Sequence, residues 1–456
     1  MIEKAPEFSI IDHLKSNEYI QIFTNILISS DDSIEELIKK INLNYYYWDK
    51  VKHLKNETLD NIPELKNKNI DPKGILWFLV KLKRKTIEKN NVLFGSTRVV
   101  EYKYNVNDFL LQKLHYIDFN FGAGIQKEQL LNDLDKQQYL SNALMEESIF
   151  SSMIEGATST RVKAKDMLRK GKKPANKSEQ MILNNYRTIQ YISEHKNEEL
   201  TLEKLFEIHK LVTENTLEEE SIGKFRTTDD VMVMNQITGE IVHTPPPFKE
   251  LNGLMKDYCN FFNNNPKDDF IHPIVKAAIL HFLIGYIHPF VDGNGRTARA
   301  LFYWYLLKNG YWLAEYLSIS RVILKTKTQY EKAYIYSEID DMDVTYFIQY
   351  QVKVLIQAFE DLKNYIAKKK KEENNLSKYL KFPEINERQA QVLYWIEEDK
   401  NRFFTIKEIE NIFNVTNQTA RTDIEELVKK EFLKKIKINN KSFNYWKGEK
   451  FNEVFL

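Results

Sequence analysis

A short glycine-rich loop between two stretches with helical periodicity constrains the fold of this chain more than any other feature. Residues 273–287 are mostly apolar at helix-compatible intervals, and Pro289 stops the helix that they predict. Gly293-Asn-Gly295 then leads directly into a second predicted helix, which starts near Asn294 and stops before Gly310. We therefore expect two core helices joined by a tight polar loop.

The rest of the chain also favours helices over sheet. Its 456 residues include only 14 Gly and 11 Pro, while Leu, Ile, Lys and Glu are abundant, so we expect a mainly α fold. The length allows two or three packed domains. We expect a mostly helical region of unknown role at 1–120, a helical core at 121–370 and a separate small domain at 380–456. The charge run Lys368 to Lys371, followed by Glu372-Glu-Asn-Asn375, is interpreted as a helix end or a solvated linker.

The charge balance and the single cysteine restrict partners and location. The 66 Lys and Arg nearly balance the 65 Asp and Glu, so the whole chain lacks the positive field of a protein that coats nucleic acid, and any DNA contact must be local. No stretch approaches 18 apolar residues and the N-terminus does not resemble a signal peptide, so we expect no membrane partner. Cys259 cannot form an internal disulfide, which predicts a cytoplasmic protein in which this residue is a buried small hydrophobe.

The glycine-rich loop has the composition of an anion site. Gly293 and Gly295 let successive N–H groups point into one concavity, and the start of the following helix adds its free donors and positive dipole end. Arg296 and Arg299 are three apart, so they share a helical face and offer forked donors to a polyphosphate. Asp292 supplies one hard oxygen ligand for Mg²⁺, which is sufficient when substrate phosphates complete its shell.

His288 lies at the mouth of this loop and completes the set of groups. Its ordinary pKa allows it to accept a proton near neutral pH. A base, an anion cradle, a metal ligand and two guanidinium groups together predict a phosphoryl- or nucleotidyl-transfer site, in which the protein supplies positioning and charge stabilisation. Any one of these residues alone would be interpreted as part of a helix cap, a turn or a surface ion pair.

The segment His288-Pro-Phe-Val-Asp-Gly-Asn-Gly-Arg-Thr-Ala-Arg299 closely resembles the signature of Fic-domain enzymes, most of which adenylylate proteins. The resemblance implies that ATP is the co-substrate. It implies that His288 deprotonates a Ser, Thr or Tyr hydroxyl of a target protein, or of this chain itself, for attack on the α-phosphorus. Kinase-like members of the family carry lysine at the position of Gly295, so the glycine favours AMP transfer.

The same resemblance assigns roles to the other residues of the signature. Asp292 would hold Mg²⁺ between the α- and β-phosphates, and the loop backbone with Arg296 would stabilise the departing pyrophosphate. Asn294 would help to fix the phosphates, and Arg299 would meet the γ-phosphate. Phe290 would be an apolar anchor that pins the loop to the core.

A β-hairpin is predicted at about 231–244, since two short apolar runs flank the polar turn Gln236 to Gly239. An exposed hairpin edge can pair with an extended peptide. The hairpin resembles the flap of the family, which docks the target chain, here through Val231, Met232, Val233, Met234, Val242, His243 and Thr244. Tyr330 and Tyr334, helical neighbours downstream, either line the adenine pocket or pack as buried aromatic residues.

The segment Ser151-Ser-Met-Ile-Glu155-Gly156 ends a helix predicted at about 136–155 and resembles the inhibitory motif of the family. The resemblance implies a bidentate pair between Glu155 and Arg299, which would occupy the γ-phosphate position and leave ATP in an unproductive pose. Related enzymes also use such a glutamate to remove AMP from a modified protein. The sequence leaves both directions open.

Residues 386–446 resemble a winged helix-turn-helix, and the exposed start of its recognition helix would hold Asn417, Gln418, Thr419, Arg421 and Thr422. Acidic residues interleave with the lysines there, namely Asp423, Glu425, Glu426 and Glu431, so no clean basic face is predicted. DNA binding, binding of a partner protein and homodimer formation all stay open. An alternative function is a transcription regulator whose nucleotide site only senses ATP.

Overall fold

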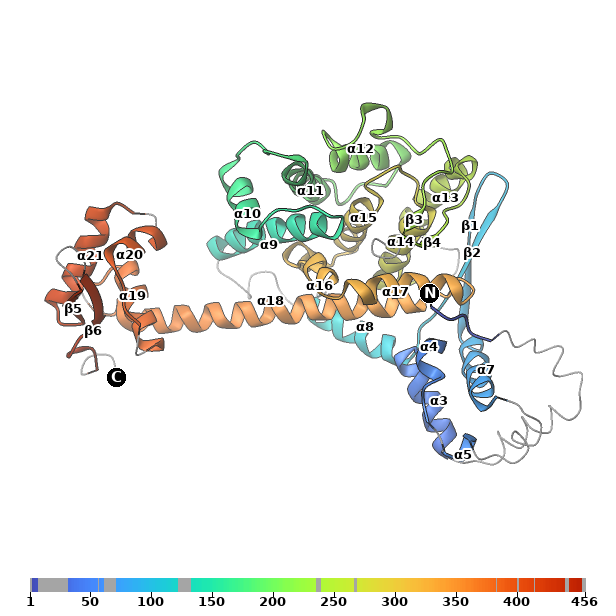
Figure 1. Cartoon of the computed structure of the whole chain (residues 1–456), viewed down its shortest axis with the longest axis horizontal. Coiled ribbons are helices and arrows are strands. Elements are labelled where there is room, and N and C mark those ends of the chain that lie inside the picture. The colour runs from blue at the N-terminus through green and yellow to red at the C-terminus, as the bar shows by residue number, and fades with distance from the viewer. Residues whose placement is uncertain are drawn as a thin grey trace, which may run out of the picture. The chain divides into compact units, whose positions relative to one another are not determined.

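The computed structural model describes residues 2–6, 32–55, 57–60, 71–121, 133–234, 239–265, 269–382, 384–399, 402–413, 415–438 and 443–452. They divide into two compact units, Met1–Glu360 and Asp361–Leu456. The fold is mainly α, as expected, and its strands form two-stranded hairpins (Figure 1). Across these ranges, no helix combines the length and apolar character that a membrane crossing requires.

The elements of the first unit follow in chain order, with η marking a 3₁₀ helix. They are α3 (Asp32–Asn44), α4 (Trp48–Val51), α5 (Glu57–Asp60), α7 (Pro72–Lys85), β1 (Glu88–Phe94), β2 (Val99–Asn105), α8 (Asp108–Phe121), α9 (Asp133–Ile154), α10 (Arg161–Lys170), α11 (Lys177–Glu194), α12 (Leu202–Thr213), η1 (Glu219–Ser221), β3 (Val233–Met234), β4 (Ile241–His243), η2 (Phe248–Glu250), α13 (Leu251–Asn263), α14 (Pro273–Ile287), α15 (Asn294–Lys308), η3 (Trp312–Tyr316), α16 (Ile319–Lys325), α17 (Lys327–Ile339) and the first part of α18 (Thr345–Leu380).

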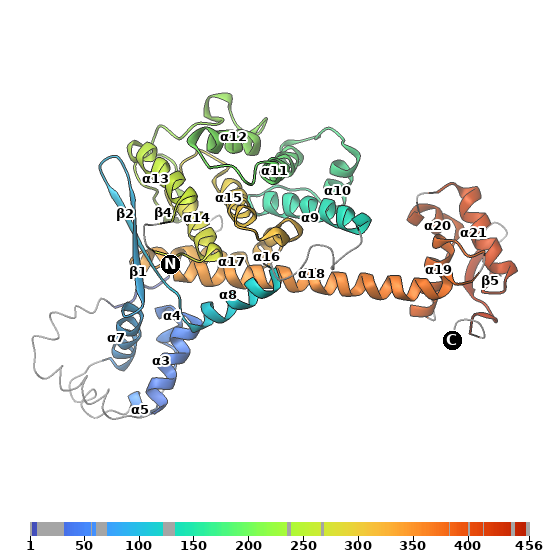
Figure 2. The same ribbon diagram turned by 180° about the vertical axis from the view of Figure 1, so that it is seen from behind.

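Helices α14 and α15 form the centre of the first unit, as the sequence predicted. They pack side by side, with α9, α11 and α12 against α15 and with α13 against α14 (Figure 2). Twelve of the fifteen residues of α14 are buried, which is the behaviour of a helix that is apolar on every side. The polar loop is therefore held between two helices that are packed into the core.

The N-terminal region was predicted to be mostly helical, and the hairpin of β1 and β2 was missed. The two strands pair antiparallel from Glu88 opposite Asn105 to Phe94 opposite Val99. The polar start of β1, with Glu, Lys and two Asn, has poor strand propensity, so tertiary contacts must decide its structure. The backbone N–H of Lys103 donates to the carbonyl oxygen of Met342, and the turn of the hairpin is held by the carboxylate of Glu250.

The helix predicted at about 136–155 is present as α9, and it ends as predicted. Gly156 has a φ of +90°, which is the left-handed conformation that glycine adopts easily after a helix. Behind this turn, α9 packs against α10 and α11 through Ile149, Ala164, Met167 and Ile182. Cys259 is buried, as expected, and burial raises the pKa of its thiol to about 12.

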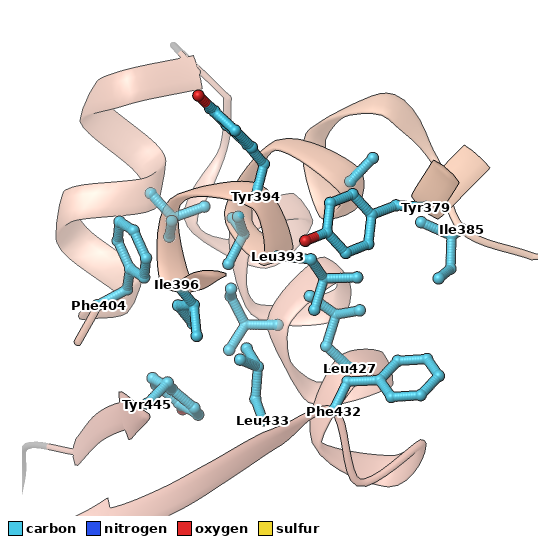
Figure 3. Close-up of a cluster of buried hydrophobic side chains, with 14 of the residues drawn as sticks. Tyr379, Ile385, Leu393, Tyr394, Ile396, Phe404, Leu427, Phe432, Leu433 and Tyr445 are labelled. Atoms are coloured by element: carbon cyan, nitrogen blue, oxygen red, sulfur yellow. The ribbon is translucent and has the colours of Figure 1, made fainter. Parts of the chain in front are cut away.

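The second unit is a small helical domain with a two-stranded wing. It contains the end of α18, then α19 (Glu387–Glu398), α20 (Ile406–Phe413), α21 (Asn417–Lys429), β5 (Leu433–Lys437) and β6 (Phe443–Lys447). Its core gathers side chains from each of these elements, among them Tyr379, Leu393, Phe404, Leu427, Leu433 and Tyr445 (Figure 3). This arrangement agrees with the predicted winged helix-turn-helix.

Two expectations about charged residues are corrected by the structure. The run Lys368 to Lys371 is not a helix end, because α18 continues through it to Leu380. Asp423 was counted among the charges that break a basic face, but it is buried and accepts hydrogen bonds from Arg388 and Asn386. Its charge is therefore neutralised inside the domain.

Candidate active site

The loop between α14 and α15 opens on a strained residue. His288 is the last residue before the loop and has a φ of +48°, in the left-handed region that side chains other than glycine rarely adopt. Its backbone N–H still donates to the carbonyl oxygen of Ile284. Residues held in this region cost about 1–3 kcal/mol and concentrate at functional sites.

The imidazole of His288 is oriented by the helix that precedes it. Nδ1 lies 3.2 Å from the carbonyl oxygen of Gly285 and therefore carries the proton. This leaves Nε2 unprotonated and able to accept a proton. Burial lowers the pKa of His288 below its ordinary value, so the neutral ring predominates at neutral pH. The predicted general base has the tautomer and the charge state that this role requires.

Phe290 and Asn294 lock the loop onto the core. Phe290 is fully buried, as the sequence predicted for an anchor. Its backbone N–H donates to Oδ1 of Asn294 at 2.9 Å, and Nδ2 of Asn294 donates back to the carbonyl oxygen of Phe290 at 2.8 Å. Both ends of the Asn294 amide thus hold the loop, and its predicted help in fixing the phosphates stays a prediction.

His209, on α12, was not singled out from the sequence and is the central support of the loop. Its ring stacks on Phe290 with centroids 3.8 Å apart and an interplanar angle of 6°. Nδ1 accepts the backbone N–H of Gly223, so Nε2 carries the proton and donates to the carbonyl oxygen of Asp292 at 2.9 Å. Burial lowers the pKa of His209 to about 4, which keeps this neutral tautomer. Only its place among apolar helix neighbours could have marked it, and that pattern predicts no more than a core histidine.

Arg226 is a second support that the sequence left without a role. It lies before the flap and is 3% exposed. Nε donates to the carbonyl oxygen of His288 at 3.0 Å, and Nη2 donates to the carbonyl oxygen of Pro246, which follows the flap. Its backbone N–H donates to the carbonyl oxygen of Pro289. One side chain thus fixes the loop between α14 and α15 and one end of the flap together.

The predicted anion cradle is assembled at the N-terminus of α15. Gly293 has a φ of +82°, and a Cβ there would lie 2.9 Å from a methyl of Thr213, so only glycine fits. Arg296 and Arg299 are each 1% exposed. Nε and Nη2 of Arg296 and Nη1 of Arg299 are buried without a hydrogen-bond partner among the described residues. A buried guanidinium group with unused donors calls for an anion.

Glu155 and Ser151 lie on Arg299, as the inhibitory motif predicted, but the contact is not bidentate. Nη2 of Arg299 donates to Oε1 of Glu155 at 2.9 Å and to the carbonyl oxygen of Ser151 at 2.9 Å. Nε donates to Oγ of Ser151 at 2.9 Å. A Cβ at Gly295 would lie 2.9 Å from Cδ of Glu155 and closer still to its Oε1, so the glycine makes room for this carboxylate.

A cavity of about 250 Å³ opens beside His288. Its lining includes Glu155, Gly295 and the two tyrosines named from the sequence, Tyr330 and Tyr334. Tyr330 accepts a hydrogen bond from Nε2 of His281, because Nδ1 of that histidine accepts from Gln351. The two tyrosines therefore both line the cavity and pack, so the two interpretations of the sequence are compatible.

The hairpin predicted at about 231–244 is present with short strands, and its turn at 235–238 lies outside the described residues. Val233 pairs with His243 and Met234 with Ile241. Val231, Val233 and Val242 are partly exposed, Thr244 is exposed, and Met232 and Met234 are exposed by 42% and 59%. These side chains remain available for docking.

His243 differs from the rest of the flap because it points inward and is 8% exposed. Its Nδ1 lies 2.7 Å from Oε2 of Glu338 on α17, and its Nε2 lies 2.7 Å from the carbonyl oxygen of Tyr286. The side chain of His243 therefore anchors the flap, and the predicted part of this residue in docking the target stays a prediction.

The donor set suits a magnesium ion only together with a bound phosphate. The side chain of Asp292 is 47% exposed at the cradle, and its Oδ2 lies 3.4 Å from Nη2 of Arg296. Within the ranges that the structure describes, no three His, Cys, Asp or Glu side chains gather as a metal cluster. One carboxylate beside an anion cradle fits Mg²⁺ that arrives with a nucleotide and retains water ligands.

Residues 199–306 match the Fic/DOC family, and residues 388–437 match the DeoR-like helix-turn-helix domain. The chain therefore contains a Fic domain and a DeoR-like helix-turn-helix domain. The first match spans α12, the flap and the loop between α14 and α15, and the second spans most of the second unit.

Curated relatives are similar over a limited part of the chain. "Protein adenylyltransferase Fic" from Nematostella vectensis is 36% identical over 119 residues, which is 25% of this chain and 25% of that protein. The protein of the same name from Culex quinquefasciatus is 37% identical over 117 residues, which is 26% of this chain and 21% of that protein. The chain thus spans about a quarter or less of the length of these relatives.

The solved structures to which this chain is similar include two proteins named for the same domain. A Fic family protein from Desulfovibrio desulfuricans G20 is 18% identical, with 74% of this chain and 95% of that chain covered and a TM-score of 0.49. Residues 134–508 of Fic-1 from C. elegans are 16% identical, with 80% of this chain and 92% of that chain covered and a TM-score of 0.46.

Proposed function

Because the chain contains a Fic domain whose signature residues converge on one loop, we propose that it is a protein nucleotidyltransferase that transfers AMP from ATP to a protein hydroxyl. The observation that carries the proposal is the pair of buried arginines at the start of α15. In the described part of the chain, Nε of Arg296 and Nη1 of Arg299 have no hydrogen-bond partner, and Nη2 of Arg296 has only the carboxylate of Asp292 at 3.4 Å, beside the backbone donors of the loop. The phosphates of a nucleotide would supply the missing acceptors.

His288 would act as the general base. Its Nε2 would take the proton of a Ser, Thr or Tyr hydroxyl, and the oxygen would form a bond to the α-phosphorus of ATP. The bond from that phosphorus to the oxygen that bridges to the β-phosphate would break, and pyrophosphate would leave. Backbone donors around Gly293 and the guanidinium group of Arg296 would stabilise the charge of the leaving group. Bound Mg²⁺, held through Asp292, would neutralise further phosphate charge.

Glu155 supports the proposal that the enzyme is normally inhibited. Its hydrogen bond to Nη2 of Arg299 places a carboxylate where the γ-phosphate would meet the same guanidinium. Two anions close to each other in a partly buried site repel, so ATP would be shifted away from His288. Removing the carboxylate would remove this repulsion and leave room for the γ-phosphate at Arg299.

Labelling with radioactive ATP tests the proposal. Glu155→Gly protein with Mg²⁺ and α-labelled ATP should label itself or a partner in a lysate, and Glu155→Gly combined with His288→Ala should abolish the label. The unmodified chain should label weakly. Transfer of label from γ-labelled ATP would mean phosphorylation and would contradict AMP transfer, as would labelling that survives loss of His288.

Removal of AMP from a modified protein is a second candidate, favoured by one observation. Glu155 and His288 line the same cavity, so the carboxylate lies where it could orient a water molecule. In that case the unmodified chain should release AMP from a protein that the Glu155→Gly variant has labelled, while Glu155→Gly itself should not. Equal release by both would exclude a role for the glutamate in hydrolysis.

A further inference from the structure

Residues 161–177, called here the basic segment, concentrate positive charge in a chain whose total charge is nearly balanced. The segment carries eight basic residues and one acidic residue, a net charge of +7, whereas the whole chain has a formal net charge of +1. It consists of α10, the loop that follows it and the first residue of α11. The basic residues are Arg161, Lys163, Lys165, Arg169, Lys170, Lys172, Lys173 and Lys177.

Two carboxylates hold part of this charge in a fixed arrangement without neutralising it. Glu146 of α9 binds both Arg161, through Nε and Nη2, and Lys165, through Nζ. Asp166 gathers the side chains of three further residues, Arg169, Lys170 and Lys172. Each carboxylate is outnumbered by its cations, so both clusters keep a net positive charge.

The cations of the basic segment remain accessible. The side chains of Arg169, Lys170 and Lys172 are exposed by 71%, 53% and 56%. Lys163, Lys173 and Lys177 are exposed and lie beyond ion-pair distance of every carboxylate in the described part of the chain. Such a surface should create a local positive potential that attracts a polyanion.

The apolar side of α10 is already used, which argues against a membrane as the partner. Ala164 and Met167 are buried against Ile149 of α9 and Ile182 of α11. Val162 is exposed by 79% but stands alone between Arg161 and Lys163. A helix that binds a lipid surface needs a broad free apolar face, and α10 has none among these residues.

We propose that the basic segment binds the phosphate backbone of a nucleic acid. The same chain contains a DeoR-like helix-turn-helix domain, whose fold is used to read DNA. In that domain Nη1 of Arg421 lies 3.8 Å from Oε1 of Glu425, and Nζ of Lys435 lies 3.6 Å from the same oxygen. The positive charge of the helix-turn-helix domain is therefore partly cancelled. Helix α10 has 10 residues and is therefore about 15 Å long, which matches roughly four phosphates along one DNA strand. The proposal does not depend on nucleotidyl transfer.

Salt-dependent binding of the full chain tests this surface. Fluorescence anisotropy of a labelled DNA duplex of mixed sequence gives Kd at several KCl concentrations. The quadruple variant Lys163→Gln, Lys170→Gln, Lys173→Gln and Lys177→Gln should bind more weakly, and its slope of log Kd against log salt should be smaller by about 3 to 4. The matched control replaces four exposed lysines elsewhere, Lys39, Lys40, Lys83 and Lys85, with Gln and should behave as the unmodified chain.

Two further arms separate the segment from the helix-turn-helix domain and from other partners. The effect of the quadruple variant should persist when the wing also carries Lys434→Gln and Lys437→Gln. Ultraviolet cross-linking of the unmodified chain to the duplex should label peptides from 161–177. An unchanged slope in the quadruple variant would overturn the proposal. Binding of polyglutamate without binding of the duplex would also overturn it, because the partner would then be an acidic protein.

Discussion

Glu155 and Arg299 are 144 residues apart in the sequence, and Nη2 of Arg299 donates a hydrogen bond to Oε1 of Glu155 at 2.9 Å. The arginine is 1% exposed, whereas the side chain of the glutamate is 31% exposed. Withdrawing Glu155 would therefore return a partly hydrated carboxylate to water but leave a buried guanidinium group in need of an anion. The pair is arranged so that a nucleotide phosphate can replace the carboxylate.

A methyl group at residue 295 should displace Glu155. In Gly295→Ala, the new Cβ would overlap the carboxylate of Glu155, so the hydrogen bond to Arg299 should be lost. Hydrogen bonds to charged groups are worth about 1.5–3 kcal/mol, so we expect labelling from α-labelled ATP to rise about tenfold or more. Initial rates of self-labelling at saturating ATP measure the effect.

The control for this prediction is the double variant of Gly295→Ala with Glu155→Gly. If the methyl group acts only through Glu155, the double variant should label as fast as Glu155→Gly alone. A slower double variant would show that the methyl group obstructs the nucleotide itself, and the steric explanation would then fail.

His209 should contribute to turnover through the geometry of the loop. In a Glu155→Gly background, His209→Leu removes the donor to Asp292 and the acceptor for Gly223, and we expect kcat to fall by about a hundredfold with a smaller change in KM for ATP. His209→Gln keeps a donor and should recover part of kcat. If His209→Leu and His209→Gln lose kcat to the same extent and also lower Tm to the same extent, His209 would have a role in core packing alone.

The geometry of the loop between α14 and α15 could be predicted from the sequence because its signals are local. Glycines, arginines and a histidine within twelve residues already determine a turn, a helix start and a base. The contact of Glu155 with Arg299, and the position of Tyr330 and Tyr334 in the cavity wall, could be predicted only through the resemblance to a family. Local pattern alone would have left each of them an ordinary helix residue.

The supports of the loop could not be predicted, for a physical reason. His209 and Arg226 act through backbone carbonyl groups of Asp292, His288 and Pro246, and such partners have no side-chain signature in a sequence. The hairpin of β1 and β2 was missed for a related reason, since contacts with residues 342–344 and 250 decide its structure and its own propensity does not. Non-local hydrogen bonding is the information that local pattern lacks.

The contact between His243 and Glu338 should control the flap. The two ring nitrogens of His243 lie 2.7 Å from Oε2 of Glu338 and 2.7 Å from the carbonyl oxygen of Tyr286, so the flap is held on both sides of the ring. Glu338→Gln removes the carboxylate from this contact, and we expect self-labelling in a Glu155→Gly background to fall several-fold. His243→Gln should have a similar effect, and the double variant should be little worse than either one.

The matched control for the flap is Glu331→Gln. Glu331 lies on the same helix, lines the same cavity and pairs with Lys327 at 4.0 Å instead of with the flap. The Glu331→Gln substitution should therefore leave self-labelling nearly unchanged. Additive losses from His243→Gln and Glu338→Gln would contradict a direct interaction between the two residues.

Acid should destabilise the first unit through its buried histidines. Burial lowers the pKa of His209 to about 4 from 6.5 and lowers that of His281 well below its ordinary value. The unfolded chain therefore binds more protons than the folded one between these values, so the free energy of unfolding falls as the pH drops from 6.5 towards 4, by up to about 3 kcal/mol from His209. Burial raises the pKa of Glu147, which opposes part of this loss.

Hydrogen exchange of peptides from α14 measures this destabilisation in the first unit alone, because buried helix amides report its larger openings. Protection should decrease steadily from pH 6.5 to pH 4 after correction for the intrinsic exchange rate. His281→Gln cannot gain a proton in the unfolded chain, so its protection should decline less steeply with acid, although it starts from a lower value because contacts with Tyr330 and Gln351 change. An identical decline in the variant would mean that other groups, His209 first among them, dominate the acid response.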